Sequence, residues 1–200
     1  MVIWRIIGFY YNPETEGYIT KIIKDSSIGA YQYDNTTNLF NKSTLYNYLN
    51  KEYKINDNLL IEIEDSEENF IKNEDETIII ENLPEKFKMK VTLMKLTDFL
   101  NASVCQNKNP VNYEKSCIDN NWLNKGINEY TMTIKYEKTS INPETEETIT
   151  PDNNLVYTIG PSINAILVTT KVNLRPVVYL KERTMLLTGD GTIDNPYIIK

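Results

Sequence analysis

The sequence has no histidine, only two cysteines and no long hydrophobic run. The absence of imidazole excludes Ser-His-Asp and Cys-His catalysis and histidine-ligated zinc. The apolar runs, of which residues 163–168 are among the longest, fall far short of the roughly 20 residues that a transmembrane helix needs. We therefore expect a chain that does not itself span a membrane and that does not use the usual hydrolytic triads.

Positive charge is also scarce. Lysine and arginine number 21 against 28 aspartate and glutamate residues, which gives a net charge of −7. A protein that binds nucleic acid needs clustered basic side chains to displace counterions from the phosphates. Nucleic acid is therefore not an expected partner, and an enzyme would have to work with lysine and carboxylates alone.

The composition is that of a globular protein. Hydrophobic residues make up 40% of the chain and charged residues 24%. Neither an internal repeat nor a Gly/Ser-rich or Pro-rich linker divides the sequence. We expect one domain over residues 1–200, of the α+β class, in which two short helices accompany a mixed, mainly antiparallel sheet with long loops.

Apolar spacing predicts the two helices. Ser43 offers an N-cap oxygen to a helix whose apolar face is Leu45, Tyr48, Leu49 and Tyr53. Thr97 is the predicted cap of the second, which carries Leu96, Phe99 and Leu100. Strands are predicted at residues 2–10, 17–24, 77–81, 89–94, 130–136, 155–159, 163–168, 175–180 and 196–199. Residues 59–63 fit either a strand or a helix.

The polar segments suggest loops rather than sites. The acidic run over residues 62–76 is expected to be a solvated face, and residues 190–195 a turn, because they lack the remaining ligands of an EF-hand calcium loop. Cys105 and Cys117 bracket a polar loop at a spacing that matches no metal or redox motif. They could form one disulfide, worth about 3 kcal/mol in the chain-entropy model, or remain two thiols in a reducing compartment.

Residues 1–7 do not resemble a signal peptide, because no basic region and no small-residue cleavage site accompany the apolar stretch. Two interpretations remain open. The chain is either cytosolic, or it is a portion of a longer protein whose export signal lies upstream.

A series of segments resembles a known family: residues 4–9 (WRIIGF), 22–29 (IIKDSSIG), 91–94 (VTLM) with 97–99 (TDF), 122–123 (WL), 174–181 (LRPVVYLK), 189–192 (GDGT) and 195–197 (NPY). Their order and spacing are similar to those of uncharacterised domains at the C-terminal part of surface and pilin-like proteins of Gram-positive bacteria. The resemblance implies the C-type-lectin-like fold and a distant relationship to formylglycine-generating enzymes. The last block is the most specific.

The resemblance implies an extracellular or cell-surface domain, carried behind a membrane or prepilin segment upstream of Met1. It favours a Cys105–Cys117 disulfide, and it gives structural roles to Trp4, Arg175, Pro176, Tyr179, Gly189 and Gly191. The calcium-dependent sugar-binding signatures (Glu-Pro-Asn and Trp-Asn-Asp) are absent. Neither cysteine matches a catalytic cysteine of formylglycine-generating enzymes, so we expect no metal, no cofactor and no enzyme.

The C-type-lectin-like fold pairs the terminal strands in one sheet and leaves long loops on the opposite side. Both terminal segments, residues 3–10 and 196–200, are strand-like, which fits such a pairing. Pro176 would start a strand where a proline costs no ladder bond. For Arg175 a buried or half-buried ion pair with a loop carboxylate is the preferred role.

The expected function is that of a non-enzymatic recognition or adhesion module. An unknown protein or glycan ligand would bind the loops of residues 101–163, with candidate contacts at Trp122, Tyr130, Tyr136, Asp152, Asn153 and Tyr157. The alternative is a structural head domain of a pilus-like or surface assembly, whose loops contact other subunits.

Overall fold

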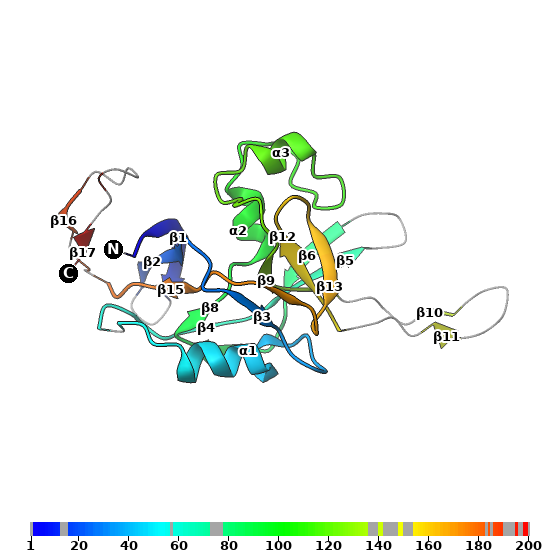
Figure 1. Ribbon diagram of the computed structural model, residues 1–200, viewed down its shortest axis with the longest axis horizontal. Helices are drawn as coiled ribbons and strands as arrows, with labels where there is room; N and C mark the ends of the chain where they lie inside the picture. Colours follow the sequence, from blue (N-terminus) through cyan, green and yellow to red (C-terminus); the bar gives the residue numbers. More distant parts are fainter. Residues whose placement is uncertain are drawn as a thin grey trace.

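The computed structural model describes residues 2–12, 16–56, 58–72, 78–135, 140–141, 148–149, 154–182, 184, 186–189, 195 and 198–199. These residues form many short strands and few short helices, so the expected α+β class is confirmed. Helix α1 (Thr44–Asn47) lies on one side of the strands, whereas α2 (Leu96–Asn101) and α3 (Lys115–Asp119) lie on the other (Figure 1).

The first predicted helix is confirmed together with its cap. The Oγ atom of Ser43 accepts a hydrogen bond from the backbone N–H of Tyr46 at 3.0 Å. A 3-10 turn, η1 (Phe40–Lys42), precedes α1, and a π-helical turn, η2 (Tyr48–Glu52), continues it. Leu45 and Leu49 are buried on its inner face, as the spacing predicts.

The second predicted helix, α2, is confirmed, but its predicted cap is wrong. Thr97 lies inside the first turn, and the Oδ2 atom of Asp98 accepts the backbone N–H of Lys95 at 2.7 Å instead. The sequence does not predict α3. Its five residues are too few to show a helical period, and only Cys117 and Ile118 in it are buried.

One sheet has four strands in the order β1 (Trp4–Asn12), β2 (Gly17–Lys24), β15 (Val177–Tyr179) and β8 (Val91–Thr92). All of its strand pairs are antiparallel, and the β1–β2 hairpin is the one that the sequence predicts. A register shift between Ile6 and Gly8 marks a bulge in β1. This sheet joins strands from the beginning, middle and end of the chain.

The second sheet has the order β13 (Asn164–Leu167), β12 (Leu155–Ile159), β9 (Glu129–Lys135), β14 (Lys171–Asn173) and β3 (Ala30–Gln32). Strand β5 (Glu68–Lys72) pairs with β9 and with β6 (Ile78–Asn82). The β9–β14 and β5–β9 pairs are parallel and the others antiparallel, which makes this sheet mixed, as expected.

Three small strand pairs complete the description: β4 (Ile63–Asp65) with β7 (Phe87–Met89), β10 (Ser140–Ile141) with β11 (Thr148–Ile149), and β16 (Leu186–Thr188) with β17 (Ile198–Ile199). The ambiguous residues 59–63 form no helix: Leu59 lies in a turn, Leu60 is bridged to Leu180, and Ile63 begins β4. The predicted strand over residues 89–94 is divided into β7 and β8.

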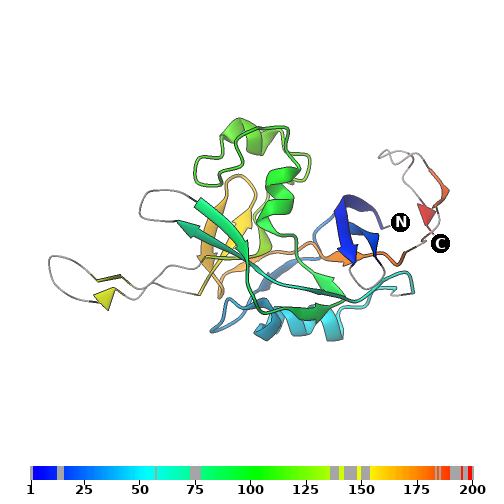
Figure 2. The same cartoon turned by 180° about the vertical axis from the view of Figure 1, so that it is seen from behind.

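The expected pairing of the terminal strands is wrong for the described residues. Strand β1 pairs with β2, and β17 pairs with β16 in a separate sheet, although both pairs lie at the same end of the molecule's long axis (Figures 1 and 2). A local strand pair closes a short loop, whereas joining the two chain ends closes a very long one at a greater cost in entropy.

In the part of the chain that the structure describes, the buried hydrophobic side chains form two clusters that share strands. Ile22 and Val178 belong to the first cluster, and their chain neighbours Ile23 and Val177 belong to the second. Side chains alternate between the faces of a strand, so β2 and β15 contribute to both clusters. The first cluster includes the buried leucines of α1 and η2, and the second includes Phe99 of α2 and Ile118 of α3.

Candidate functional site

The segment between α2 and β9 forms a lobe on one side of the molecule. This disulfide lobe (residues 102–128) projects at the top of Figure 1 and contains α3. Helix α2 holds its base, because Leu96, Phe99 and Leu100 are buried in the second hydrophobic cluster. The rest of the lobe is mostly irregular and polar, as the sequence predicts.

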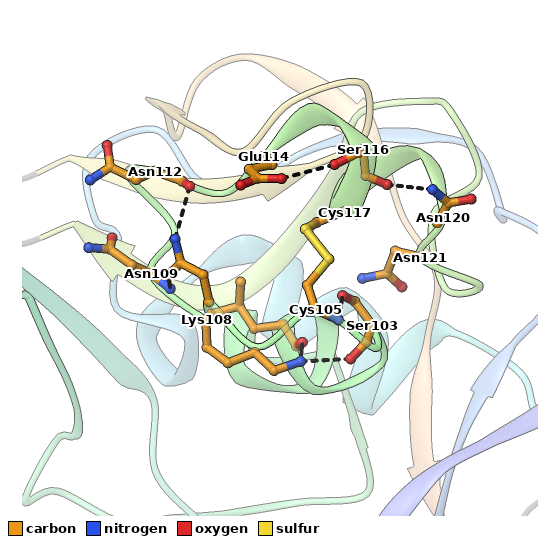
Figure 3. The surroundings of a disulfide bond; sticks show 12 residues. Ser103, Cys105, Lys108, Asn109, Asn112, Glu114, Ser116, Cys117, Asn120 and Asn121 are labelled. Atoms are coloured by element: carbon orange, nitrogen blue, oxygen red, sulfur yellow. Dashed lines mark hydrogen bonds between the residues drawn. A yellow bond between two sulfur atoms is a disulfide. The ribbon is translucent and has the colours of Figure 1, made fainter.

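Cys105 and Cys117 form the predicted disulfide. Their Cα atoms are 5.9 Å apart, a usual separation for such a bond. The bond ties the loop after α2 to α3 (Figure 3). The Nζ atom of Lys108 reinforces the same loop by donating to the carbonyl oxygens of Leu100 and Ser103, at 2.7 Å each. The lobe is therefore held by a covalent link and by an internal ammonium group.

Asparagine side chains hold much of the lobe's backbone. The Oδ1 atoms of Asn107, Asn109, Asn121 and Asn124 each accept the backbone N–H of the residue two positions further on, at 2.9–3.0 Å. These are turns in which a side chain replaces a backbone acceptor. The asparagine-rich composition of the lobe thus has a structural explanation at these positions.

Trp122 is the exposed aromatic residue of the lobe. Its side chain is 46% exposed, whereas its neighbours Asn121 and Leu123 are only 3% and 0% exposed. Asn121 donates from Nδ2 to the carbonyl oxygen of Phe99 at 2.7 Å, and the carbonyl oxygen of Leu123 accepts from Arg175 at 2.7 Å. The backbone is therefore fixed on both sides of an indole that faces solvent.

Arg175 fixes this turn from the core. Its Nη2 atom donates to Oε2 of Glu129 at 2.6 Å as well as to Leu123, and both charged side chains are fully buried. The expected ion pair is confirmed, although Glu129 begins β9 rather than lying in a loop. Burial raises the pKa of Glu129 above its usual range, and the guanidinium opposes that shift.

A second ion pair ties the lobe to the first sheet. Lys125 lies 2.7 Å from Oδ1 of Asp25, and Arg5 donates to the same carboxylate. Burial alone would raise the pKa of Asp25, but the hydrogen bonds from Arg5 and Lys125 lower it below its usual value. The chain around Trp122 is thus attached to both sheets.

Two of the other predicted contact residues, Tyr130 and Tyr157, do not join Trp122 on the surface. Tyr130 and Tyr157 are buried, at 1% and 7% exposure, so they are core residues rather than exposed aromatics. The reason is that β9 and β12 are covered on both faces. Tyr136, Asp152 and Asn153 lie outside the described residues.

Most of the residues with a predicted structural role lie in or beside the first sheet. Tyr179 is buried against Tyr10 with ring centres 5.5 Å apart, and Trp4 is partly buried against the first hydrophobic cluster. Pro176 precedes β15, and its carbonyl oxygen accepts the N–H of Lys24 at 3.0 Å. Gly189 has a φ of 100°, which favours glycine. Gly191 lies outside the described residues.

The sequence analysis does not predict the exposure of several other apolar residues. Within the lobe they are Val104, Val111 and Ile127, at 95%, 53% and 40% exposure. The β1–β2 hairpin exposes a second group, the hairpin patch: Ile6, Phe9, Tyr11 and Tyr18. Tyr11 lies opposite Tyr18 in the register, with ring centres 5.4 Å apart. The near alternation of β2, which predicts a wet face, is the signal that could have found Tyr18.

The sequence predicts that the acidic run over residues 62–76 is a solvated face. This prediction is wrong for two of its glutamates. Glu67 and Glu68 are 2% and 5% exposed. Glu67 accepts the backbone N–H of Phe40, and Glu68 accepts the hydroxyl of Thr133 at 3.0 Å. Burial, with a smaller contribution from Glu85, raises the pKa of Glu67 to about 8.

The described residues form a shallow depression, and the buried Glu67 and Glu68 are not among the residues that line it. That depression has a volume of about 130 Å³ and is bordered by Tyr10, Asn12, Glu62, Ile63, Glu64, Lys86 and Lys88.

Among the described residues, no group of three or more acidic or cysteine side chains is arranged to hold a metal ion. Within the same ranges, no helix has the length and apolar character to cross a bilayer.

No family model, curated protein or solved structure matches this chain. The family resemblance of the sequence therefore stays a prediction. The function has to be inferred from the geometry of the site.

Proposed function

We propose that this protein is a non-enzymatic recognition or adhesion module that binds its ligand through the disulfide lobe. The observation that carries the proposal is the exposure of Trp122 between two buried, hydrogen-bonded neighbours. An exposed tryptophan on a fixed backbone offers a large contact area, and little conformational entropy is lost when it is covered. Binding sites commonly place such residues at their centre.

The other features of the lobe support the same role. Val104, Val111 and Ile127 add apolar surface within the same segment. The disulfide and the Asp25 ion pairs hold the lobe in one conformation before any ligand arrives, which reduces the entropy cost of binding. The proposed ligand is a protein or a glycan, bound without a cofactor.

We place the module outside the cell. Disulfides persist in oxidising compartments and are rare in the cytosol, and the Cys105–Cys117 bond fits an extracellular or cell-surface location. The sequence resemblance suggests the same location, and the lobe would be among the loops that such domains vary. The terminal strands β1 and β17 do not pair with each other, so the C-type-lectin-like fold itself is not part of the proposal. Determination of the N-terminal sequence of the native gene product would test the location.

The binding role is tested by replacing Trp122. We expect Trp122→Ala to weaken binding by about 30-fold or more to any ligand found by screening glycan and protein arrays with and without calcium, as for a central interface tryptophan. The matched control is Tyr18→Ala, which removes an exposed aromatic residue from the hairpin patch. Wild-type affinity in a folded Trp122→Ala variant would contradict the proposal.

A specific observation favours a second function, that of a structural domain in a surface assembly. The hairpin patch exposes Phe9 and Tyr18 at 68% and 70%, and exposed apolar groups of this kind mark contact surfaces. In that case the purified protein should self-associate in sedimentation experiments. Tyr18→Ser should then reduce association and Trp122→Ala should not, the reverse of the pattern expected for ligand recognition.

A further inference from the structure

Tyr31 in β3 and Tyr48 at the start of η2 form a pair whose rings stack and whose hydroxyl groups are in contact. Their rings are stacked with centres 4.7 Å apart and planes inclined by 28°. Their hydroxyl oxygens are 2.8 Å apart. Because the oxygens are closer together than the ring centres, the rings converge at their hydroxyl ends. The ring carbons ortho to the hydroxyls lie at this converging end.

We propose that Tyr31 and Tyr48 form a site of oxidative modification, at which a one-electron oxidant joins the two rings in a dityrosine cross-link. The tyrosine pair lies in a different part of the chain from the disulfide lobe (residues 102–128), and its oxidation would be a separate property. It does not depend on the proposed recognition function.

Cross-linking is a two-electron oxidation of the pair. Each phenol loses one electron and its hydroxyl proton to become a phenoxyl radical, whose unpaired electron is shared with the ortho carbons. One new carbon–carbon bond joins an ortho carbon of each ring. The hydrogens on these two carbons then move to the oxygens and restore the phenols. The protein loses two hydrogen atoms in total, and a haem peroxidase uses them to reduce one hydrogen peroxide to two waters.

The surroundings of the pair permit this chemistry. Both rings are partly buried against the first hydrophobic cluster, so an oxidant can reach them while packing holds them together. Burial and the hydrogen bond with Tyr31 raise the pKa of Tyr48 to about 12. At neutral pH this phenol is protonated, as an ordinary tyrosine is, and it loses its proton together with the electron. The disulfide is consistent with an oxidising environment.

Other tyrosine pairs provide internal comparisons. Tyr11 and Tyr18 are more exposed, but their rings meet edge to face at 65°, so the two hydroxyl ends do not converge in the same manner. Tyr33 and Tyr130 also meet edge to face, and both are buried. Geometry rather than exposure therefore selects Tyr31 and Tyr48 for coupling within one molecule.

The test treats the full chain with a haem peroxidase and limiting hydrogen peroxide, then isolates the monomer on a denaturing gel. We expect dityrosine fluorescence, the loss of two hydrogen atoms by mass spectrometry, and a linked peptide pair containing Tyr31 and Tyr48. The link closes a loop with a sequence separation of 17, so it should raise the melting temperature by roughly 5–10 °C.

Variants distinguish this site from general tyrosine oxidation. Tyr31→Phe and Tyr48→Phe should each lose the cross-link in the monomer, whereas the control Tyr11→Phe should keep it. Linked peptides that involve other tyrosines, a monomer without dityrosine, or an unchanged yield in folded Tyr31→Phe would overturn the proposal. Trp122-dependent ligand binding should be the same before and after cross-linking, so the two proposals can fail separately.

Discussion

At the scale of single residues, the buried charged side chains explain how the disulfide lobe is positioned. Arg175 fixes the turn beside Trp122 and pairs with Glu129, yet Oε1 of Glu129 and two nitrogens of Arg175 have no hydrogen-bond partner among the described residues. A buried pair that is only partly satisfied adds little net stability. We therefore interpret Arg175 as a residue that positions the lobe rather than as a source of stability.

Glu67 makes the stability of the fold depend on pH. Its pKa is about 8 in the folded protein against 4.5 for an ordinary glutamate, because it is buried. Below pH 4.5 both states are protonated; as the pH rises to about 8, only the unfolded state ionises, so the contribution to stability is lost. We expect the free energy of unfolding to fall over this range, by at most about 1.4 kcal/mol per pH unit from this group.

The measurement is urea denaturation at a series of pH values, for the wild type and for Glu67→Gln, which does not titrate. The difference between the two proteins should change between pH 5 and pH 8 in favour of the variant. Glu62→Gln, which replaces an exposed glutamate directly before β4, serves as a control. A constant difference between wild type and Glu67→Gln would show that Glu67 titrates normally.

At the scale of elements, the local signal for a helix cap was right for α1 and wrong for α2, where Thr97 lies inside the helix. Ser43 caps α1 as predicted, because the cap is a contact between residues close in sequence. The division of the predicted strand over residues 89–94 could not be predicted. There the Oδ1 atom of Asn50, distant in sequence, accepts the N–H groups of Lys90 and Val91 at 3.0 and 3.1 Å.

We expect helix α3 to depend on the disulfide. It is five residues long, and a helix this short is not stable by itself. We expect the double variant Cys105→Ser/Cys117→Ser to lose about 3 kcal/mol of stability. Hydrogen exchange should show faster exchange over residues 102–120, while β9 and β12 keep their protection. Ser116→Ala, in the same helix, serves as the control, and slow exchange in the lobe of the double variant would contradict this prediction.

At the scale of the whole molecule, the two hydrophobic clusters are expected to unfold together. Neighbouring residues of β2 and of β15 belong to different clusters, so neither cluster can lose its packing without disturbing the same strands. Far-ultraviolet and near-ultraviolet circular dichroism should therefore report one coincident denaturant transition. Two separated transitions would show independent units and would contradict the prediction of a single domain over residues 1–200.

The sequence by itself determined the α+β class, the β1–β2 hairpin, the cap of α1 and the presence of a tryptophan in a polar, cysteine-containing segment. These features depend on residues that are near one another along the chain. Only the tertiary structure decided that Trp122 is exposed while Tyr130 and Tyr157 are buried, that β17 pairs with β16, and that Arg175 fixes the lobe. Burial and pairing of this kind depend on which distant segments cover a residue, and local patterns of hydrophobicity do not specify those partners.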